Sequence, residues 1–422
     1  MKLVFHGGAR EVGRSCIEVA TATKRLLLDC GLKIASHDSE YPINLPVVND
    51  IHAVFISHAH LDHTGGLPLM DHKGMDCPIF MTKTTRELTR LILKDAFKVG
   101  KITHQHLGYD EPDIRKVLSC IRKVVVDTKG GFDGISFEFF DAGHIPGSSS
   151  IFMDVEGTTL LYTGDINNSE TLLLHAAETD FPEIDILVCE STYGAKDHPL
   201  RVKEEQRFID AIKSTLSNHG SAIIPVFAIG RAQEILLMLS KYKFGCNVYF
   251  DGMCIEATDI ILSDPEDIVD SEALAAVMKR VRLVHKEPER LTAINKPSII
   301  VTTSGMLTGG PVLAYLRYLY NKPNSSVLIT GYQAEDTNGR MLLEKREVYI
   351  DGMKKKVQCR VEQFDFSAHS GMSQLKAMVR KLKPKKVFFV HGEVQSALAM
   401  QEWASALGME AYAPELGDVM TL

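Results

Sequence analysis

Residues 54–68 read VFISHAHLDHTGGLP and place three histidines and an aspartate directly after an apolar run. Such a run is typical of a buried strand. Neutral imidazole and carboxylate groups are typical ligands of zinc and related ions. A histidine-rich surface loop is the alternative, but it gives no reason for so dense a cluster. We therefore predict a metal site that includes His58, His60, Asp62 and His63.

Three more polar residues follow strand-like runs elsewhere in the chain. His144 lies in DAGHIPG, Asp165 in LYTGD and His391 in VFFVHGE. Each of them alone is compatible with an ordinary structural role. Together with the first cluster they exceed the three or four ligands that one ion needs. The sequence therefore predicts two ions, about 3.5–4 Å apart in sites of this kind.

The spacing divides these ligands between the two ions. We expect one ion to be held by His58, His60 and His144, the other by Asp62, His63 and His391, with Asp165 bridging both. Asp29, in LLLDCG, is expected to accept hydrogen bonds from histidine N–H groups rather than to bind metal.

The chain alternates strand-like and helical segments throughout. Up to about residue 200, short β-branched runs separated by glycine turns favour two sheets covered by helices. A regular strand–helix alternation then indicates a parallel sheet with crossover helices. The first pattern returns near residue 350. We predict an α/β protein with an inserted α/β domain, divided into residues 1–195, 196–350 and 351–422.

Composition narrows the class of protein. Of 422 residues, 45% are hydrophobic and 24% are charged, which is typical of globular proteins, and no apolar run reaches membrane-spanning length. The eight cysteines form no C-x-x-C pair, which argues against a disulfide framework or a cysteine zinc finger. The start, MKLVFHGGAR, lacks the apolar core of a signal peptide, so we expect a cytoplasmic protein with no membrane partner.

Several motifs resemble those of a known family. HAHLDH matches the H-x-H-x-D-H signature of the metallo-β-lactamase superfamily. VCESTYG, FDFSAHSG and FVHGE resemble motifs A, B and C of the β-CASP nucleases, which carry an inserted α/β domain. The opening GGAREVGRSCIEV is most similar to the catalytic subunit of the cleavage and polyadenylation specificity factor and its archaeal relatives, with ribonuclease J next. The resemblance covers essentially the whole chain.

The resemblance implies a fold, a cofactor and a substrate. The fold would be an αββα metallo-β-lactamase sandwich with a β-CASP insertion, and the cofactor two zinc ions per chain. His391 at motif C favours single-stranded RNA over DNA. Hydrolysis would leave 5′-phosphate and 3′-hydroxyl ends, in RNA 3′-end processing or decay. Endonuclease and 5′-to-3′ exonuclease action both stay open, and a homodimer is one of the oligomeric states that the sequence leaves open.

The candidate catalytic residues are Glu190, His369 and Asp62, of which Asp62 is also a ligand. Glu190 in motif A would orient His369 in motif B, and His369 would protonate the leaving oxygen. Two glycine turns before helices are candidate RNA phosphate sites, with Arg231 in one and Ser304 and Gly305 in the other.

Three other classes of protein compete with a ribonuclease. A lactamase- or glyoxalase-type hydrolase would share the metal ligands but has no use for the insertion or for His369 and His391. A flavin-linked di-iron oxidoreductase would show more carboxylate ligands. A catalytically weak RNA-binding scaffold would be expected to have lost ligands, whereas every ligand position is filled here.

Overall fold

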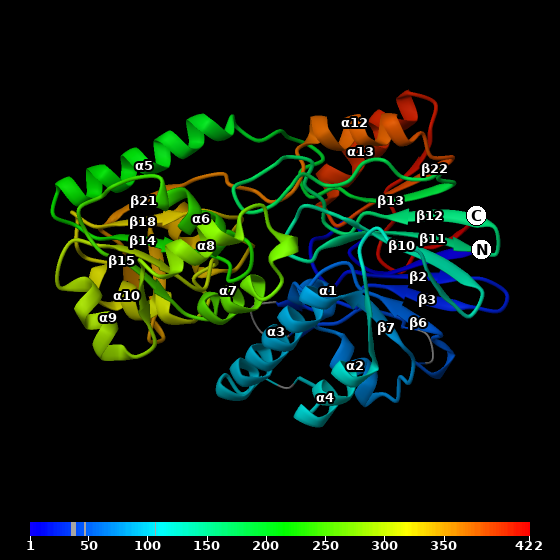
Figure 1. The fold of residues 1–422 in the computed structure, drawn as a ribbon, viewed down its shortest axis with the longest axis horizontal. Helices are drawn as coiled ribbons and strands as arrows, with labels where there is room; N and C mark the ends of the chain where they lie inside the picture. Colours follow the sequence, from blue (N-terminus) through cyan, green and yellow to red (C-terminus); the bar gives the residue numbers. More distant parts are fainter. Residues whose placement is uncertain (35–38, 46–47, 106) are drawn as a thin grey trace. The chain divides into compact units, whose positions relative to one another are not determined.

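The computed structural model of the protein describes residues 1–422 except residues 35–38, 46–47 and 106. The chain forms two compact units (Figure 1). The first unit comprises residues 1–170, 175–197 and 369–422. The second unit comprises residues 171–174 and 198–368. The chain thus leaves the first unit, builds the second, and returns.

The first unit contains two seven-stranded sheets. One has the order β24 (Val419–Thr421), β1 (Lys2–Gly7), β2 (Cys16–Ala20), β3 (Arg25–Leu28), β6 (Ala53–Phe55), β7 (Ile79–Thr82) and β8 (Ile121–Val124). The other has the order β23 (Glu410–Tyr412), β22 (Lys386–Val390), β13 (Ile186–Glu190), β12 (Thr158–Tyr162), β11 (Ser149–Val155), β10 (Ile135–Asp141) and β9 (Gly130–Phe132). A small hairpin pairs β4 (Lys33–Ile34) with β5 (Ser39–Glu40).

The two sheets pack face to face through a core of large apolar side chains. Phe5 and Phe55 of the first sheet contact Phe388 and Phe137 of the second, with ring centroids 5.7 and 5.1 Å apart. All four side chains are buried in one cluster that draws on both sheets. Burial of alternate residues on the facing sides of two sheets is what forms a sandwich core.

Helices cover the outer faces of this sandwich. Residues of α2 (Leu67–His72) and α4 (Glu111–Cys120) pack on the outside of the first sheet, as Met70 and Val117 show. Residues of α12 (Met372–Leu382) and α13 (Val394–Ala406) pack on the outside of the second, as Leu375 and Met400 show. The short α1 (Leu61–Thr64) and the long α3 (Lys83–Ile102) complete the first layer (Figure 1). The result is an αββα sandwich.

The second unit is built on a six-stranded sheet whose paired strands are all parallel. Its order is β16 (Arg282–Val284), β15 (Val248–Asp251), β17 (Ile299–Thr302), β14 (Ala222–Pro225), β18 (Ser326–Ile329) and β21 (Arg360–Gln363). Its helices are α5 (Arg201–Ser217), α6 (Arg231–Ser240), α7 (Cys254–Leu262), α8 (Ser271–Met278), α9 (Glu287–Ile294), α10 (Pro311–Leu319) and α11 (Asn338–Lys345). A hairpin of β19 (Glu347–Ile350) and β20 (Met353–Lys356) precedes the last strand.

The predicted fold class, an α/β sandwich with an inserted α/β domain, is confirmed by this architecture. We expected the chain to return to the first domain near residue 350. It stays in the second unit up to residue 368, because β21 pairs with β18. In the part of the chain that the structure describes, no helix has the length and apolar character to cross a bilayer.

Candidate active site

The predicted ligands lie just beyond strand ends in the first unit. His58 and His60 follow β6, while Asp62 and His63 lie in α1. The others follow β10, β12 and β22, and these are His144, Asp165 and His391. Because β12, β13 and β22 are neighbouring parallel strands, the loops after them leave the sheet at one edge. All seven side chains fall into two adjacent groups.

The first group consists of His58, His60, His144 and Asp165, whose ligand atoms lie within 4.8 Å of one another. Nε2 of His58 and Nε2 of His144 lie 3.1 and 3.2 Å from Nδ1 of His60. The same two Nε2 atoms lie 3.5 and 3.6 Å from Oδ2 of Asp165. Four donors around one tetrahedral zinc, each about 2.0–2.1 Å from the ion, would be about 3.3 Å apart. The group therefore fits one zinc-sized ion.

The protonation state of this group suits metal binding. The Ser57 hydroxyl donates to Asp29, so it is Nδ1 of His58 that donates to Ser57 Oγ, 3.0 Å away, and Nε2 keeps its lone pair. Burial lowers the pKa of His58 well below its usual range and that of His60 to about 4. Both imidazoles are therefore neutral, which is the form that binds a metal.

The second group consists of Asp62, His63 and His391. Oδ2 of Asp62 lies 3.3 Å from Nε2 of His391 and 3.9 Å from Nε2 of His63. Oδ2 of Asp165 lies 3.5 Å from Nε2 of His63, the same distance as from His58. One oxygen of Asp165 thus touches both groups, as a bridging ligand must. Nε2 of His63 is buried and has no hydrogen-bond partner among the described residues, which leaves it available to a cation.

The side chains of the second group and Asp165 stabilise one another's charged forms. Burial would raise the pKa of Asp165, but His391 and His63 outweigh it and lower that pKa well below its usual range. In the same way, His63 and His391 lower the pKa of Asp62. Burial would lower the pKa of His391, but Asp165 and Asp62 raise it to about 10. A metal that binds here must therefore displace protons.

Asp29 supports both groups without belonging to either. Its Oδ2 accepts hydrogen bonds of 2.7 Å from Nδ1 of His63, from the Ser57 hydroxyl and from the Tyr162 hydroxyl. Its Oδ1 accepts from the backbone N–H of Ser57 at 2.7 Å. Because Nδ1 of His63 is the donor to Asp29, it is Nε2 that faces the second group, and this atom offers a lone pair once a metal displaces its proton. This placement supports the orienting role predicted for Asp29.

We expect Asp29→Asn to weaken zinc binding about 10–100-fold, because an amide cannot stabilise the His63 N–H as a carboxylate does. Titration against a chelator of known affinity measures this. The matched control is Asp251→Asn in the second unit, since Asp251 is also buried and also accepts from a tyrosine, Tyr315, at 2.8 Å. Equal zinc affinity of Asp29→Asn and the unmodified protein would contradict the assignment.

The structure adds three residues to this site that the sequence reasoning missed. Ser57 and Tyr162 bind Asp29, as described above, and the Thr192 hydroxyl donates to the carbonyl of His391 at 2.9 Å. Ser57 directly precedes His58, so its position carried a signal. Tyr162 and Thr192 could be assigned only once the sheets were placed.

Glu190 and the partly exposed His369 form a hydrogen-bonded pair next to the two metal groups. Nδ1 of His369 lies 2.9 Å from Oε1 of Glu190, and Glu190 is fully buried. The carboxylate is fixed by the backbone N–H groups of Ile166, at 2.9 Å, and Thr192, at 3.1 Å. The His369 ring lies 4.6 Å from that of His144, centroid to centroid. Burial would lower the pKa of His369, but Glu190 and then Asp165 raise it, so the protonated imidazole is favoured.

The two predicted phosphate loops meet within the second unit. Arg231 begins α6 after β14, and Ser304 and Gly305 follow β17, which is parallel to β14 and next to it. A Cβ on Gly305 would lie 3.0 Å from the backbone nitrogen of Phe227, which is a tight contact, so glycine favours the close approach of the loops. Their proximity agrees with a shared anion site, and their role in binding phosphate stays a prediction.

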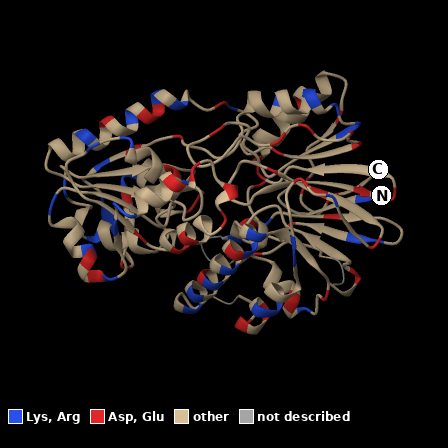
Figure 2. Ribbon diagram, in the orientation of Figure 1, with Lys and Arg blue, Asp and Glu red and all other residues tan. Residues whose placement is uncertain are grey.

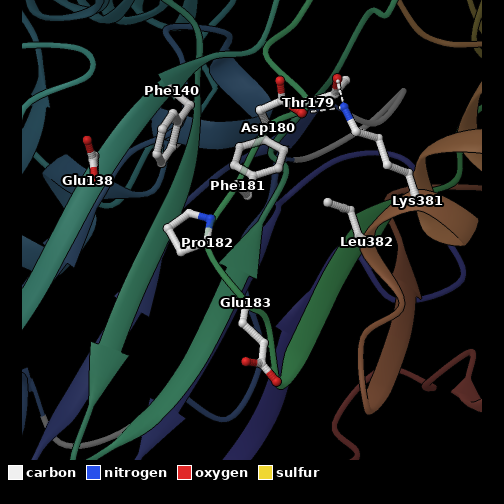
Figure 3. Close-up of a pocket in the computed structure, with 9 residues that line it drawn as sticks. All are labelled: Glu138, Phe140, Thr179, Asp180, Phe181, Pro182, Glu183, Lys381 and Leu382. Carbon is white, nitrogen blue, oxygen red and sulfur yellow. Dashed lines mark hydrogen bonds and ion pairs between the residues drawn. The ribbon is translucent and has the colours of Figure 1, made fainter.

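The first unit also has a surface pocket, and the residues that line it are different from those of the predicted site (Figure 3). Phe140 of β10 and Phe181 form one wall, with ring centroids 5.1 Å apart, and Lys381 pairs with Asp180 at 2.6 Å. The side chains around it include none of the metal-ligand candidates. Nothing in its chemistry indicates a catalytic role.

Comparison with known proteins places the chain in a family. Three family models match it: the Metallo-beta-lactamase superfamily domain over residues 17–186, the Beta-Casp domain over 232–342, and the Zn-dependent metallo-hydrolase RNA specificity domain over 354–414. The chain is 40% identical to the probable RNase MJ4 of Methanocaldococcus jannaschii over 99% of each protein. It belongs to the β-CASP ribonucleases of the metallo-β-lactamase superfamily.

Other β-CASP relatives cover most or all of the chain. The RNase aCSPSF2 of Saccharolobus solfataricus is 33% identical over 99% of the chain and 84% of the relative. The transcription termination factor FttA of Methanocaldococcus jannaschii is 36% identical over 94% of the chain and 68% of the relative. A solved structure of a protein of unknown function from Enterococcus faecalis V583 shares the fold, with a TM-score of 0.62 and 15% identity over 100% of the chain and 99% of that structure. This β-CASP protein is thus a metallo-hydrolase of the ribonuclease class, and the predicted resemblance to the archaeal members is confirmed.

Proposed function

We propose that the protein hydrolyses phosphodiester bonds in single-stranded RNA with two zinc ions, leaving 5′-phosphate and 3′-hydroxyl ends. The proposal rests on one observation above all. Oδ2 of Asp165 lies 3.5 Å from a nitrogen of each metal group, so that two ions can share it. A paired site of this kind stabilises both the attacking and the leaving oxygen of a displacement at phosphorus.

The ions, when bound, would supply a nucleophilic water at neutral pH and neutralise charge on the phosphate oxygens. The chain's own residues supply the rest. His58 and His60 hold neutral nitrogens towards the centre. Asp165, Asp29 and Asp62 outweigh burial and raise the pKa of His63 well above its usual range, so an ion that binds there must displace its proton. Asp165 and Asp62 hold negative charge at the centre. Asp62, with 29% of its side chain exposed, reaches solvent, as the partly exposed His60 also does, and Asp62 stays a candidate for a catalytic role as well.

We assign the proton for the leaving 3′-oxygen to His369. Because its Nδ1 binds Glu190, the proton to be transferred is on Nε2. Glu190 is held by two backbone N–H groups and cannot turn away, so it fixes both the ring orientation and the charged state. A general acid needs both of these properties.

This function predicts a preference between two nucleic acids. The purified protein should contain about two equivalents of zinc, as two groups of ligands require, and should cleave single-stranded RNA much faster than DNA of the same sequence. End-labelled substrates in parallel reactions measure the rates, and elemental analysis measures the zinc. Equal rates on RNA and DNA, or full cleavage by protein that contains no metal, would overturn the assignment.

A circular RNA separates the two modes of attack. Only an endonuclease can open a circle, whereas a 5′-to-3′ exonuclease needs an end. A linear RNA of the same sequence, with a 5′-monophosphate, serves as the control for overall activity.

A further inference from the structure

The outer face of α3 carries positive charge along its whole length. The helix contains six basic and two acidic residues in a chain whose net charge is −7. At 3.6 residues per turn, all six basic residues and the acidic Glu87 fall within an arc of about 120°. The basic residues are Lys83, Arg86, Arg90, Lys94, Lys98 and Lys101. We call this arc the α3 stripe (Figure 2).

The charges at the two ends of the stripe differ in their partners. At the start, Arg86 and Arg90 both bind Glu87. At the end, Lys94, Lys98 and Lys101 are exposed, and the ion pairs of the described residues include none with them. Leu93 and Phe97, at the edge of the stripe, pack in a buried cluster that holds the helix, and Lys101 Nζ lies 4.3 Å from the centre of the Phe97 ring.

The spacing of the basic residues in the stripe lowers the stability of the helix. Arg86, Arg90, Lys94 and Lys98 are each four residues apart, and like charges at this spacing repel and destabilise a helix. An exposed helical face serves solubility equally well with mixed charges. A face with six basic residues and one acidic residue, Glu87, therefore favours a polyanion as its partner.

The stripe starts at the metal centre. The hydroxyl groups of Thr82 and Thr85, at the first turn of α3, both donate to the carbonyl of Gly147 at 2.8 Å. Gly147 lies three residues after the ligand candidate His144. Its φ is +79°, and a Cβ there would lie 2.9 Å from the backbone of Thr85, so the contact requires glycine. The helix therefore leads directly away from the loop that holds a metal ligand.

We propose that the α3 stripe binds the phosphates of single-stranded RNA on their way to or from the metal centre. This inference rests on the proposed ribonuclease function. The far end, at Lys101, lies about 28 Å along the axis from Thr82, at 1.5 Å per residue. Only RNA longer than the few nucleotides at the centre can reach it. The stripe then adds affinity for long RNA and leaves the chemical step alone.

The test replaces the three lysines at the far end, as Lys94→Gln, Lys98→Gln and Lys101→Gln in one protein. With single-stranded nucleic acid the salt slope of log K changes by about 0.7 per phosphate contact, so three lost contacts should lower it by about 2. Affinity for a 20-nucleotide RNA should then fall on the order of 10–50-fold near 0.15 M salt. Binding of a trinucleotide should not change. Fluorescence anisotropy over a salt series measures both, in a His369→Ala background that prevents turnover.

The control removes three exposed lysines elsewhere in the first unit, as Lys2→Gln, Lys123→Gln and Lys129→Gln, and so matches the change in net charge. It should keep the salt slope of the parent. In the otherwise unmodified enzyme, the α3 variant should raise KM for the 20-nucleotide RNA with kcat unchanged.

Three outcomes overturn the inference. The first is an α3 variant with the parent's salt slope. The second is a control variant that loses as much affinity for the 20-nucleotide RNA as the α3 variant does. The third is loss of binding to phosphatidylserine vesicles with RNA binding intact, which would assign the stripe to a membrane surface. If the parent enzyme cleaves no RNA, the proposed function fails, while the anisotropy still reports on the stripe.

Discussion

An Asp165→Ala protein should lose both zinc ions and RNA cleavage together. The carboxylate is the one ligand whose oxygen lies 3.5 Å from a nitrogen of both groups, so its removal leaves each group short of a donor. Two-metal catalysis contributes several kcal/mol of charge stabilisation, and about 1.4 kcal/mol corresponds to tenfold in rate. We expect the rate to fall by on the order of 10³-fold or more, measured with zinc content on the same preparation.

The control for Asp165→Ala is Asp185→Ala in the same sheet. Asp185 precedes β13 and accepts from the backbone N–H of Thr159 at 2.9 Å, so its loss perturbs the sheet without touching a ligand. This protein should keep two zinc ions and most of its activity. If Asp165→Ala keeps both ions, the bridging assignment is wrong.

A His369→Ala protein should separate chemistry from binding. His369 lies close to Asp165 and Glu190 in a third cluster, but its Nδ1 donates to Glu190 and the two groups described above are complete without it. Both zinc ions and the affinity for RNA should therefore persist. General-acid assistance typically contributes about 10²–10⁴-fold, and kcat should fall within that range. Single-turnover cleavage with saturating protein measures the chemical step alone.

Two further variants sharpen this result. Glu190→Gln should give a milder loss, because the amide still orients the ring but no longer favours its charge. His72→Ala is the matched control, since His72 also pairs with a carboxylate, Asp113, at 2.9 Å, but on the exposed surface of α2 and α4. It should cleave like the parent. Loss of zinc and RNA affinity together in His369→Ala would make this residue a ligand or a structural element instead.

Much of the site could be predicted because its signals are local. His58, His60, Asp62 and His63 lie within six residues, and a strand with a short helix after it is enough to gather them. The fold class was also predictable, since the change from short β-branched runs to strand–helix alternation follows directly from how each kind of sheet is buried. Asp165 and His391 required an assumption about strand ends meeting at one edge, and the pairing of β12, β13 and β22 supplies it.

The remaining features depend on contacts between distant segments. Tyr162 donates a hydrogen bond to Asp29 across the sandwich. The two residues are 133 positions apart in the sequence, and no periodicity predicts such a hydrogen bond. The extension of the second unit to residue 368 depends on β21 joining the edge of its sheet, and an isolated edge strand has no distinctive pattern. The α3 stripe is different, because the spacing of four residues between its basic side chains is visible in the sequence. That the stripe begins next to the proposed metal centre could be seen only from the contact of Thr82 and Thr85 with Gly147.

The order of the ligands along the chain has a consequence for synthesis. Six of the seven proposed ligands precede residue 166, whereas His391 follows the whole second unit. His369 likewise is the first residue after that unit. A growing polypeptide on the ribosome, surrounded by RNA, therefore lacks both the proposed proton donor and the last proposed ligand until the second unit has been made. The proposed site can thus form only after the second unit has been synthesised.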